Sequence, residues 1–447
     1  MIWKNKKITM LGLGVLGRGV GVAKFLAEQE ADLIITDLKS ERELQSSLKR
    51  LKKYKNIQYV LGKHRISDFR NRDFIIKAAG VPLDSIYIQE ARKNKIPIEM
   101  DASFFAKLSN ARIIGVTGTR GKSTVTHLLY EIFKKNGSRV FLGGNVKGLA
   151  TLPLLKKVKE GDIVLMELDS WQLQGFGEAK ISPSVSVFTN FLDDHLNYYK
   201  NNRQKYFSDK ANIFRYQKKD DSLIVSRQAN KEIKKYFKGK IKSKILLAGD
   251  FNLPKEWRIK ILGKHNLRNI ALAVKAAQVL GVKKKIIKKA VEEFKGVPGR
   301  LKFIRKFKGV EYYNDTTSTM PDAAIAALKS FLPKKARESN IILIGGGADK
   351  SLNYKSFVEE LKGRAKALIL FKGAATDKIM REIKKMGFGC EYGTQTVDSM
   401  KNALNLANEY ARKGDIVLLS PGAASFGVFK NEFDRGAQFC KIVMKLK

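Results

Sequence analysis

The stretch ARIIGVTGTRGKST, residues 111–124, indicates the fold class of this chain. In it a short apolar run ends in a glycine-rich loop, and the amphipathic pattern VTHLLYEIF, residues 125–133, follows. A strand, a tight loop and a helix in this order are typical of parallel sheets with crossover helices. Similar runs recur, so we predict an α/β protein; they are KKITMLGLG, ADLIITD, FIIKAAG, DIVLMELD, VSVFTN, SLIVS, NIILIGGG, ALILFKG and DIVLLSPG.

The loop TGTRGKST, residues 117–124, has the composition of a phosphate-binding loop. Backbone N–H groups of such a loop wrap a triphosphate, Lys122 would neutralise its β and γ oxygens, and Ser123 or Thr124 would hold Mg²⁺. Val116 occupies the place of the usual first glycine, so the loop is shorter than the common form. A chance helix cap is the alternative, but GKST between a strand and a helix favours phosphate binding.

Polar residues follow the next two predicted strands, at the sheet edge where ligands of α/β proteins collect. Glu167 lies near the carboxyl end of the run DIVLMELD, and Asp193, Asp194 and His195 follow VSVFTN. Carboxylate oxygens are the ligands that Mg²⁺ prefers, so both groups are candidate metal ligands. Other interpretations stay open at this point. Glu167 can be an ordinary acidic residue at a strand end, and the DDH cluster of Asp193, Asp194 and His195 can be a solvated turn. Lys210, fifteen positions after His195, can be one surface lysine among many.

A second glycine pattern lies near the amino terminus. Gly12, Gly14 and Gly17 form G-x-G-x-x-G directly after KKITML, and Asp37 ends the next predicted strand. The glycines let the backbone approach a phosphate at a helix N-terminus, and the acid accepts a hydrogen bond from a sugar or base. The pattern favours a nucleotide or nucleotide sugar over a turn needed only for packing, and nothing downstream resembles a hydride-transfer site.

Length and composition limit the organisation of the chain. Its 447 residues suffice for about three domains, because single cores stop growing well below this length. Breaks occur at 108–110 and at GVPGR, residues 296–300, where Pro and Gly interrupt a helical pattern. We therefore predict domains at 1–108, 109–299 and 300–447. Cys390 and Cys440 are too few for a disulfide framework or a cysteine zinc site.

The chain is strongly basic. It has 86 Lys and Arg residues against 43 Asp and Glu residues, a formal net charge of +43. Such a charge attracts polyanions, but the lysines are dispersed, without the aromatic residues or motifs that read nucleic acid. We therefore expect no specific nucleic-acid binding. The start of the chain lacks a cleavage site and no run of about 18 apolar residues occurs, so we expect a cytoplasmic protein without membrane insertion.

The order of the motifs resembles that of the Mur ligases. The segments that carry the resemblance are TGTRGKST, GGN, ELDSWQL, NFLDDH, SDKANIF, GKHNLRN and GVPGR, followed by LLSPGAASFGVFKNEFDRG. Together with the first glycine loop they cover nearly the entire chain. The resemblance implies a Rossmann-like domain for the UDP moiety, a central P-loop-type ATPase domain with a mostly parallel sheet, and a Rossmann-like carboxyl-terminal domain for the incoming amino acid.

The resemblance also implies a reaction. ELDSWQL and the LLSP segment are most similar to those members that add glutamate to UDP-N-acetylmuramoyl-L-alanine during peptidoglycan precursor synthesis. In such an ATP-dependent amide ligase, ATP phosphorylates the substrate carboxylate, the glutamate amine attacks the acyl phosphate, and phosphate leaves. Two Mg²⁺ ions would offset the repulsion between carboxylate and triphosphate. We expect a monomer that takes UDP-N-acetylmuramoyl-L-alanine, glutamate, in the D form, and ATP as its small-molecule substrates.

Roles for particular residues follow from the same resemblance. The implied ATP-binding residues are Gly118, Thr119, Gly121, Lys122, Ser123, Thr124, Asn266 and Asn269 at adenine, Arg300 at the γ-phosphate, and Asp315 at the ribose. The implied metal ligands are Ser123, Glu167, His195 and Lys210, the last as a carbamylated lysine. The implied UDP-sugar residues are Gly14, Val15, Leu16, Asp37, Lys39, Gly80 and Asn145. The implied amino-acid residues are Thr319, Lys350, Ser425 and Phe426. The implied catalytic residues are Lys122, His195, Lys210 and Lys350.

The chain departs from the Mur ligase pattern at several positions. Thr317 stands where the family often has a lysine associated with the glutamate side chain, and Glu432 stands where an aromatic residue is expected, with Phe433 one place later. A ligase that uses L-glutamate or another amino acid is therefore an alternative. Two readings of other classes are a basic NTP-dependent nucleic-acid-binding protein and a non-catalytic nucleotide-sugar binder, for which Lys122 would be dispensable.

Overall fold

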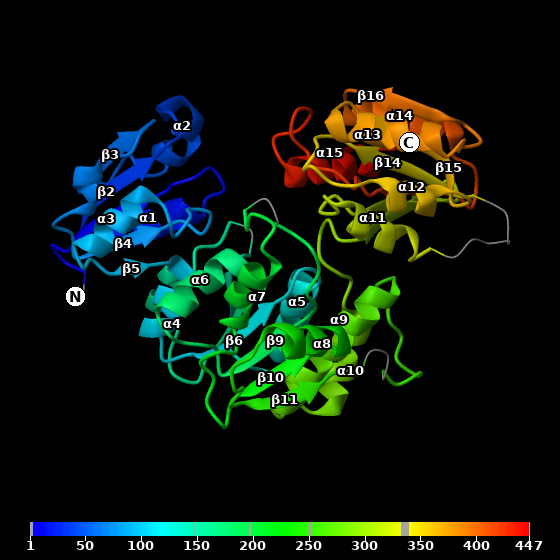
Figure 1. Ribbon diagram of the computed structural model, residues 1–447. Coiled ribbons are helices and arrows are strands. Elements are labelled where there is room, and N and C mark those ends of the chain that lie inside the picture. The colour runs from blue at the N-terminus through cyan, green and yellow to red at the C-terminus, as the bar shows by residue number, and fades with distance from the viewer. Residues whose placement is uncertain (1–2, 147, 196–197, 250–252, 332–338, 447) are drawn as a thin grey trace. The chain divides into compact units, whose positions relative to one another are not determined.

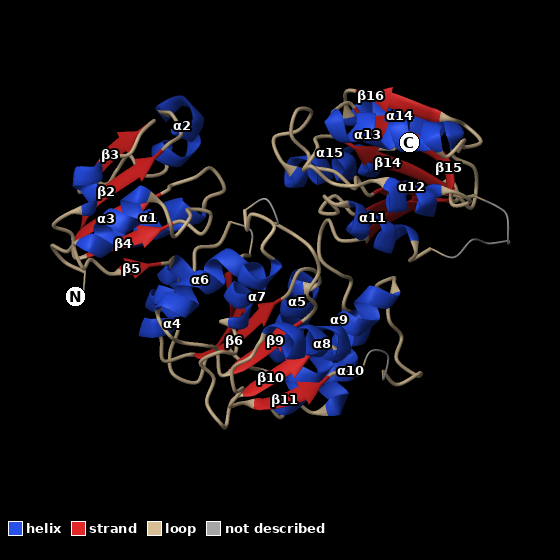
Figure 2. Cartoon of the chain, viewed as in Figure 1, coloured by secondary structure: helices blue, strands red, loops and turns tan. Residues whose placement is uncertain are grey.

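The computed structural model describes residues 3–146, 148–195, 198–249, 253–331 and 339–446. The chain forms two compact units, Met1–Lys255 with Arg268–Val291 and Glu256–Leu267 with Glu292–Lys447. The first unit holds two sheets and the second holds one, each flanked by helices (Figures 1 and 2). This mostly parallel architecture confirms the predicted α/β class. The domain limits after residues 108 and 299 remain predictions.

The first sheet has five parallel strands in the order β3-β2-β1-β4-β5. The chain adds β2 and β3 on one side of β1, and then β4 and β5 on the other. The loop after β1 therefore lies at a topological switch point, where open α/β sheets bind ligands. The elements are β1 (Lys7–Leu11), α1 (Arg18–Glu28), β2 (Asp32–Asp37), α2 (Glu41–Lys49), β3 (Ile57–Leu61), η1 (Ile66–Phe69), β4 (Phe74–Lys77), α3 (Ile86–Lys93) and β5 (Ile98–Glu99).

The second sheet has six parallel strands in the order β11-β10-β9-β6-β8-β7. Its first strand, β6, again lies between the two directions of winding, so the loop after β6 is at the switch point. Its elements and the preceding helix are α4 (Asp101–Leu108), β6 (Arg112–Thr117), α5 (Lys122–Lys135), β7 (Val140–Gly144), η2 (Leu152–Lys156), β8 (Ile163–Glu167), α6 (Ser170–Glu178), β9 (Val185–Phe188), α7 (Arg203–Ala211), β10 (Ser222–Val225), α8 (Arg227–Tyr236), β11 (Lys244–Leu247), α9 (Lys264–Val279) and α10 (Lys284–Glu293).

The third sheet has the order β12-β13-β17-β14-β15-β16, and only the edge pair β12–β13 is antiparallel. The chain winds outward from β14 and returns to place β17 beside it, so the loops after β14 and β17 meet at the switch point. The elements are β12 (Lys302–Phe307), β13 (Val310–Asn314), α11 (Pro321–Leu328), β14 (Ile341–Gly346), α12 (Lys355–Leu361), β15 (Ala365–Phe371), α13 (Ala374–Lys385), β16 (Thr394–Val397), α14 (Met400–Tyr410), β17 (Ile416–Leu419) and α15 (Glu432–Met444).

Central strands of the second and third sheets are buried on both faces. All residues of β8, β9, β10, β14, β15 and β17 are buried, which explains why they read as continuous apolar runs. Every one of the ten predicted runs is a strand in the structure. Among the helices of the described residues, none is long and apolar enough to span a membrane.

Candidate active site

The two glycine loops begin their helices in the same way. Helices α1 and α5 start after Gly17 and Gly121, both left-handed with φ of 89° and 85°, and neither has a side-chain cap. By contrast, α2 and α6 are capped by Ser40 and Asp169. Because the N-cap residues Gly17 and Gly121 have no side chain to cap these helices, both helix starts suit an anion.

The second loop is held tightly against neighbouring elements. A Cβ atom at Gly118 would lie 1.9 Å from Thr189 Oγ1, and one at Gly121 would lie 2.2 Å from Asn269 Oδ1, so both positions require glycine. Asn190, just after β9, accepts hydrogen bonds from the backbone N–H groups of residues 119 and 120 at 2.9 and 2.8 Å. Asn269 therefore lies beside the loop, and its role as an ATP-binding residue remains a prediction.

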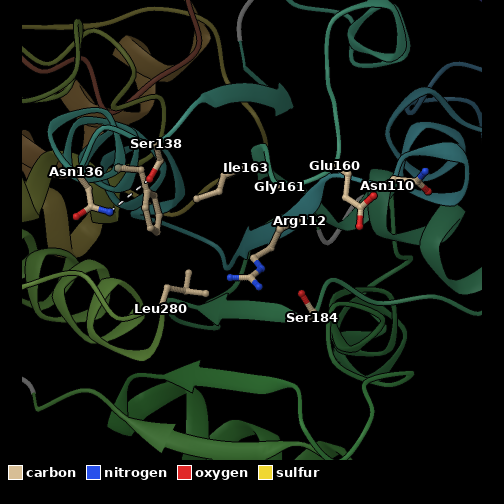
Figure 3. Close-up of a pocket in the computed structure, with 10 residues that line it drawn as sticks. Asn110, Arg112, Asn136, Ser138, Glu160, Gly161, Ile163, Ser184 and Leu280 are labelled. Atoms are coloured by element: carbon tan, nitrogen blue, oxygen red, sulfur yellow. Dashed lines mark hydrogen bonds between the residues drawn. The ribbon is translucent and has the colours of Figure 1, made fainter.

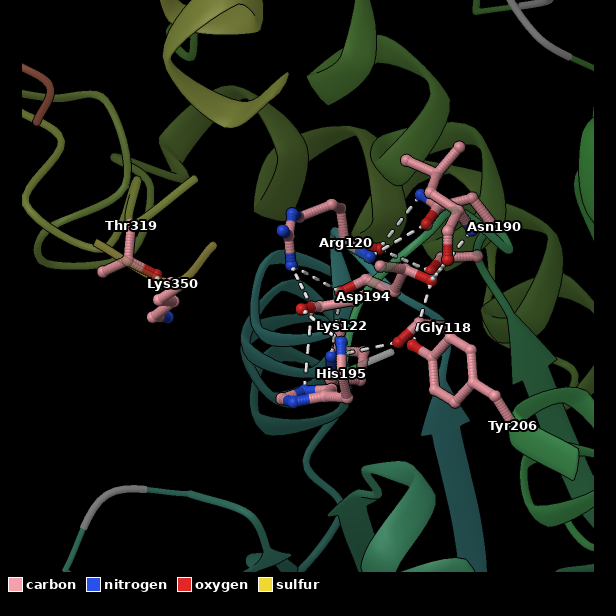
Figure 4. Close-up of polar contacts among 12 residues, drawn as sticks. Gly118, Arg120, Lys122, Asn190, Asp194, His195, Tyr206, Thr319 and Lys350 are labelled. Carbon is pink, nitrogen blue, oxygen red and sulfur yellow. Dashed lines mark hydrogen bonds and ion pairs between the residues drawn. The ribbon is translucent and has the colours of Figure 1, made fainter. Parts of the chain in front are cut away.

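Three cations gather at this loop, and Figure 4 labels two of them, Arg120 and Lys122. Lys122 Nζ donates to the carbonyl oxygens of Gly118 and Thr119 at 3.0 and 3.2 Å. Lys210, which is 2% exposed, donates to the same Gly118 oxygen at 3.0 Å. Arg120 forms an ion pair with Asp194. Burial, reinforced by the charge of Lys122, lowers the pKa of Lys210 well below its ordinary value. This concentration of positive charge suits a polyphosphate.

The acidic residues after β9 pair with arginines. Asp194 accepts from Arg120 at 2.8 Å, and Asp193 pairs with Arg203. Burial alone would raise the pKa of Asp194, but Arg120 and His195 hold it below its ordinary value. Around the residues that the structure describes, no group of three His, Cys, Asp or Glu side chains is arranged to hold a metal ion. Among the described residues, Asp193, Asp194 and His195 therefore do not form a metal site by themselves.

His195 lies beside Asp194 and the ring of Trp171. Its Nε2 is 3.7 Å from Asp194 Oδ2, and its ring centroid is 4.7 Å from that of Trp171. Burial lowers the pKa of His195, so the neutral imidazole, which can ligate a metal, is favoured. On the other side of the loop, the Lys210 ammonium lies 4.9 Å from the Tyr206 ring centroid.

The last residue of β8 and the first turn of α5 provide oxygen atoms that suit a magnesium ion. Glu167, the last residue of β8, is 4% exposed, and no hydrogen bond or ion pair engages its carboxylate within the described ranges. A carboxylate at such a strand end, without a protein cation beside it, can accept a metal ion. Ser123 and Thr124, 7% and 5% exposed, begin the helix after the neighbouring strand β6. Glu167 and Ser123 are therefore suitable oxygen ligands for one ion.

The first glycine loop is arranged around a carboxylate instead. Asp37 Oδ2 accepts from the N–H groups of Leu13 and Gly14, each at 2.9 Å, and its Oδ1 accepts from the N–H of Lys39 at 2.9 Å. Asp37 thus shapes the loop by closing part of its backbone. Further along, Val15 and Leu16 are 48% and 62% exposed, and Gly80 is exposed too.

A buried lysine near this loop was missed by the sequence analysis. Lys77, the last residue of β4, is 1% exposed and donates to the Val81 carbonyl oxygen at 2.9 Å. Burial lowers its pKa to about 8. Lys77 therefore fixes the turn that contains Gly80, and the signal available in the sequence was a lysine ending the apolar run FIIK.

Two loops of the second unit meet at its switch point. Ala348 and Ala424 form an isolated bridge between the loops that follow β14 and β17. Lys350 Nζ donates to Thr319 Oγ1 at 3.3 Å (Figure 4). Two more residues that are predicted to bind the incoming amino acid follow Ala424: Ser425 is buried and Phe426 is 63% exposed. The structure therefore brings the predicted amino-acid residues to one edge of one sheet.

The remaining predicted ATP residues have varied surroundings. Asp315 accepts from the Leu301 N–H and from Ser420 Oγ, both at 2.9 Å, and burial raises its pKa to about 7. Asn266 Nδ2 donates to the Leu262 carbonyl oxygen at 2.7 Å. Asn266, Arg300 and Asp315 belong to the second unit, whereas Asn269 and the phosphate-binding loop belong to the first.

A further residue was missed in the second unit. Arg435 is fully buried and donates to the Thr316 carbonyl oxygen at 2.8 Å and to Thr316 Oγ1 at 3.2 Å. Burial lowers its pKa to about 10. Thr317, which replaces the expected lysine, donates its hydroxyl to the Gly299 carbonyl oxygen at 2.9 Å. Arg435 thus holds the start of the segment 316–319 that leads to Thr319.

A cavity of about 610 Å³ lies at the opposite edge of the second sheet (Figure 3). Arg112 and Ile163, which begin β6 and β8, form part of its wall, together with Glu160 and Leu280. The glycine loop follows the other end of β6, and the cavity wall contains no predicted site residue. The cavity is therefore separate from the candidate active site.

Comparisons with known proteins agree with this arrangement. Three family descriptions match the chain: "Mur ligase MurD-like, N-terminal domain" over residues 6–99, "Mur ligase middle domain" over 116–252, and "Mur ligase, glutamate ligase domain" over 299–422. Among solved structures, the chain is similar to UDP-N-acetylmuramate-alanine ligase MurC of Thermotoga maritima, with a TM-score of 0.62, 20% identity and coverage of 99% and 100% of the two chains. The MurF ligase of the same organism, in complex with ADP, has a TM-score of 0.60, 18% identity and coverage of 92% and 94%.

Curated relatives are similar along the whole length. An enzyme of Roseiflexus sp. (strain RS-1) and one of Borreliella afzelii (strain PKo), both named UDP-N-acetylmuramoylalanine–D-glutamate ligase, are each 37% identical, and each alignment covers 98% of this chain and 98% of the relative. A relative of the same name from Acetivibrio thermocellus is 32% identical, with 99% and 97% covered. Full-length similarity at this level, on a fold with the expected phosphate-binding loop, shows that the chain belongs to the Mur ligase family of ATP-dependent amide ligases in peptidoglycan synthesis.

Proposed function

We propose that this enzyme joins D-glutamate to UDP-N-acetylmuramoyl-L-alanine at the expense of ATP. The observation that carries the proposal is the loop around Gly118, where Lys122, Lys210 and Arg120 meet above uncapped helix N–H groups. The relatives named UDP-N-acetylmuramoylalanine–D-glutamate ligase support this choice of substrates. A site of this charge suits transfer of the γ-phosphoryl group to a carboxylate.

The chain's own residues can perform the positioning that this reaction needs. Lys122 and the first N–H groups of α5 would bind the β- and γ-phosphate oxygens and offset the charge that grows during transfer. The substrate carboxylate oxygen forms a bond to the γ-phosphorus while the bond to ADP breaks. The glutamate amine then attacks the carbonyl carbon, loses a proton and displaces phosphate. A free carboxylate resists amide formation because it lacks a leaving group, and phosphorylation supplies one.

Glu167, Ser123, His195 and Lys210 are proposed to hold two Mg²⁺ ions. When bound, the ions would neutralise the repulsion between the triphosphate and the attacking carboxylate. Lys210 would serve as a carbamate: its amine nitrogen bonds to the carbon of CO₂ and releases a proton, which converts a cation into an oxygen ligand. The burial of Lys210 against a single carbonyl oxygen and the Tyr206 ring supports this proposal, because an ammonium there has no carboxylate partner among the described residues.

The loop after β1 is proposed to receive the UDP moiety, through Gly14, Val15, Leu16, Lys39 and Gly80. The first N–H groups of α1 would bind its diphosphate. Asp37 would act by shaping the loop, because the backbone already engages both its oxygens.

The amino-acid site is proposed at the meeting of the loops after β14 and β17. Lys350 would pair with a carboxylate of glutamate, and Thr319, Ser425 and Phe426 would line the remainder of the site. The contact between Lys350 and Thr319 supports a shared role. Thr317 donates its hydroxyl to the Gly299 carbonyl oxygen. We therefore assign binding of the glutamate side chain to Lys350, Thr319, Ser425 and Phe426 and not to Thr317.

Identification of the product tests the choice of substrates. The enzyme is incubated with UDP-N-acetylmuramoyl-L-alanine, ATP and Mg²⁺ and with one amino acid at a time, and the products are weighed by mass spectrometry. We expect product with D-glutamate and none with L-glutamate or other amino acids. Product with a different amino acid only would contradict the proposal and favour a related ligase. A cytoplasmic location, a monomeric state and the absence of specific nucleic-acid binding remain predictions of the sequence.

A further inference from the structure

An arginine at the first glycine loop contacts a residue from another part of the first unit. Arg18, the first residue of α1, donates from its guanidinium to Asn145 Oδ1 at 2.9 Å and to the Leu149 carbonyl oxygen at 3.4 Å. Helix α1 and the loop at Ala150 approach closely, since a Cβ atom at Gly21 would lie 2.6 Å from Ala150 Cβ. The start of α1 is therefore packed against Asn145, Leu149 and Ala150.

The backbone of the same segment is fixed from the other side. The N–H of Asn145 donates to the Glu167 carbonyl oxygen at 2.5 Å. Gly144 has a φ of 75°, and a Cβ atom there would lie 2.2 Å from that same oxygen. The backbone of Asn145 thus contacts Glu167, the proposed metal ligand at the end of β8. Its side chain contacts Arg18, which follows the loop proposed to bind the nucleotide sugar.

The contact with Arg18 decides which way the Asn145 amide points. An amide oxygen that accepts from a guanidinium cannot exchange places with the NH₂ group, because two donors would then face each other. In the described part of the chain the Asn145 NH₂ group has no partner, so it is available as a hydrogen-bond donor. A donor at this place selects a carbonyl or carboxylate oxygen of a ligand.

We propose that Arg18 is a positioning residue that fixes the Asn145 NH₂ group as a donor to an oxygen of the substrate's lactoyl-alanine portion. The inference rests on the proposed function, which supplies the substrate. Arg18 acts through Asn145, so its effect depends on the asparagine and on the peptide end of the nucleotide sugar. UDP alone, which lacks that end, does not use the contact.

The test is a double-mutant cycle read by calorimetric binding. Dissociation constants for UDP-N-acetylmuramoyl-L-alanine and for UDP are measured with the wild type, Arg18→Met, Asn145→Ala and the double variant. Arg18→Met is expected to weaken binding of the nucleotide sugar about tenfold, as for loss of a charge-assisted contact, and binding of UDP less than about twofold. In the Asn145→Ala background, Arg18→Met is expected to change neither constant by more than about twofold.

Two further variants separate orientation from charge and folding. Arg42→Met removes an equal charge from an exposed position on α2 and is expected to leave both constants unchanged. Asn145→Asp keeps an acceptor for Arg18 but offers the substrate no donor, so it is expected to weaken binding of the nucleotide sugar as much as Asn145→Ala does. Retained UDP binding shows that each variant is folded.

Several outcomes would overturn the inference. They are an equal loss for UDP and the nucleotide sugar in Arg18→Met, an equal effect of Arg18→Met in both backgrounds, or full affinity in Asn145→Asp. Failure of the wild type to bind the nucleotide sugar would contradict both this inference and the proposed function. Binding by the wild type without amide formation would contradict the proposed function alone.

Discussion

The two glycine loops of the first unit share a backbone plan and differ in the charges around them. Each follows the central strand of a parallel sheet and begins a helix at a left-handed glycine without a side-chain cap. The loop after β1 surrounds the carboxylate of Asp37, whereas the loop after β6 collects Lys122, Lys210 and Arg120. The difference teaches that backbone geometry provides an anion site, while the neighbouring side chains set how much negative charge it accepts.

The largest expected effect is on the cationic loop. Lys122→Ala removes the charge beside the β- and γ-phosphates, so we expect turnover of ATP to fall by about 10³-fold with little change in binding of UDP. The measurement is steady-state phosphate release with all substrates present, with UDP titration as the control. Undiminished turnover would show that the charge difference between the loops does not direct catalysis.

A third ligand site extends the comparison to the second unit. Lys350→Ala removes a cation expected to pair with a carboxylate, a contact that contributes roughly 1.5 to 3 kcal/mol, so KM for glutamate should rise about tenfold to a hundredfold. KM for ATP should change far less. Kinetics in which each substrate is varied in turn measure both constants; equal effects on the two would remove Lys350 from the amino-acid site.

The carboxylate of the first loop offers the converse experiment. Asp37→Asn replaces an oxygen that accepts two backbone N–H groups with an amide that can satisfy only part of the pattern. We expect binding of UDP to weaken about tenfold and binding of ATP to stay within about twofold. Calorimetric titration of each nucleotide is the check. A matching loss for ATP would mean that the variant has disturbed the whole unit.

The smallest expected effect concerns stability and pH at a buried carboxyl outside both loops. The pKa of Asp315 in the folded protein is about 7, above its ordinary value of 3.8, because burial favours the neutral acid. Folding therefore binds a proton between these values, and the stabilisation present below about pH 4 is lost as the pH rises through about 7.

Asp315→Asn mimics the neutral acid and should remove this contribution. Urea unfolding at pH 5 and pH 8 measures it: the wild type should lose on the order of 1 to 4 kcal/mol relative to the variant between the two pH values. Parallel curves for the two proteins would show that Asp315 does not titrate in this range.

Local sequence patterns were sufficient for the buried strands and both loops. Runs such as DIVLMELD and NIILIGGG are strands because both faces are covered, and GKST begins a helix as predicted. Two edge strands were missed: β11 (Lys244–Leu247) is short and largely exposed although three of its four residues are apolar, and β16 (Thr394–Val397) is mostly polar. Their pairing depends on neighbours far along the chain.

Side-chain partners were harder to predict than elements. Asp37 was predicted to accept a hydrogen bond from a sugar or base, and the sequence did not indicate that backbone N–H groups donate to both its oxygens. Asp194 was a candidate ligand, yet Arg120, 74 positions away, pairs with it. Arg18 and Asn145 are separated by 127 positions, and no periodicity records such a contact. Asp194 and Arg120 meet because β6 and β9 are neighbours in one parallel sheet, whereas Arg18 and Asn145 follow strands of two different sheets.

Phosphate release from ATP tests the central claim most directly. The enzyme with Mg²⁺ and ATP receives UDP-N-acetylmuramoyl-L-alanine, one glutamate enantiomer, both together, or neither. The account predicts rapid release only when the nucleotide sugar and D-glutamate are both present, with one phosphate per amide formed. Release that is independent of these substrates, or that is stimulated by nucleic acid instead, would contradict it.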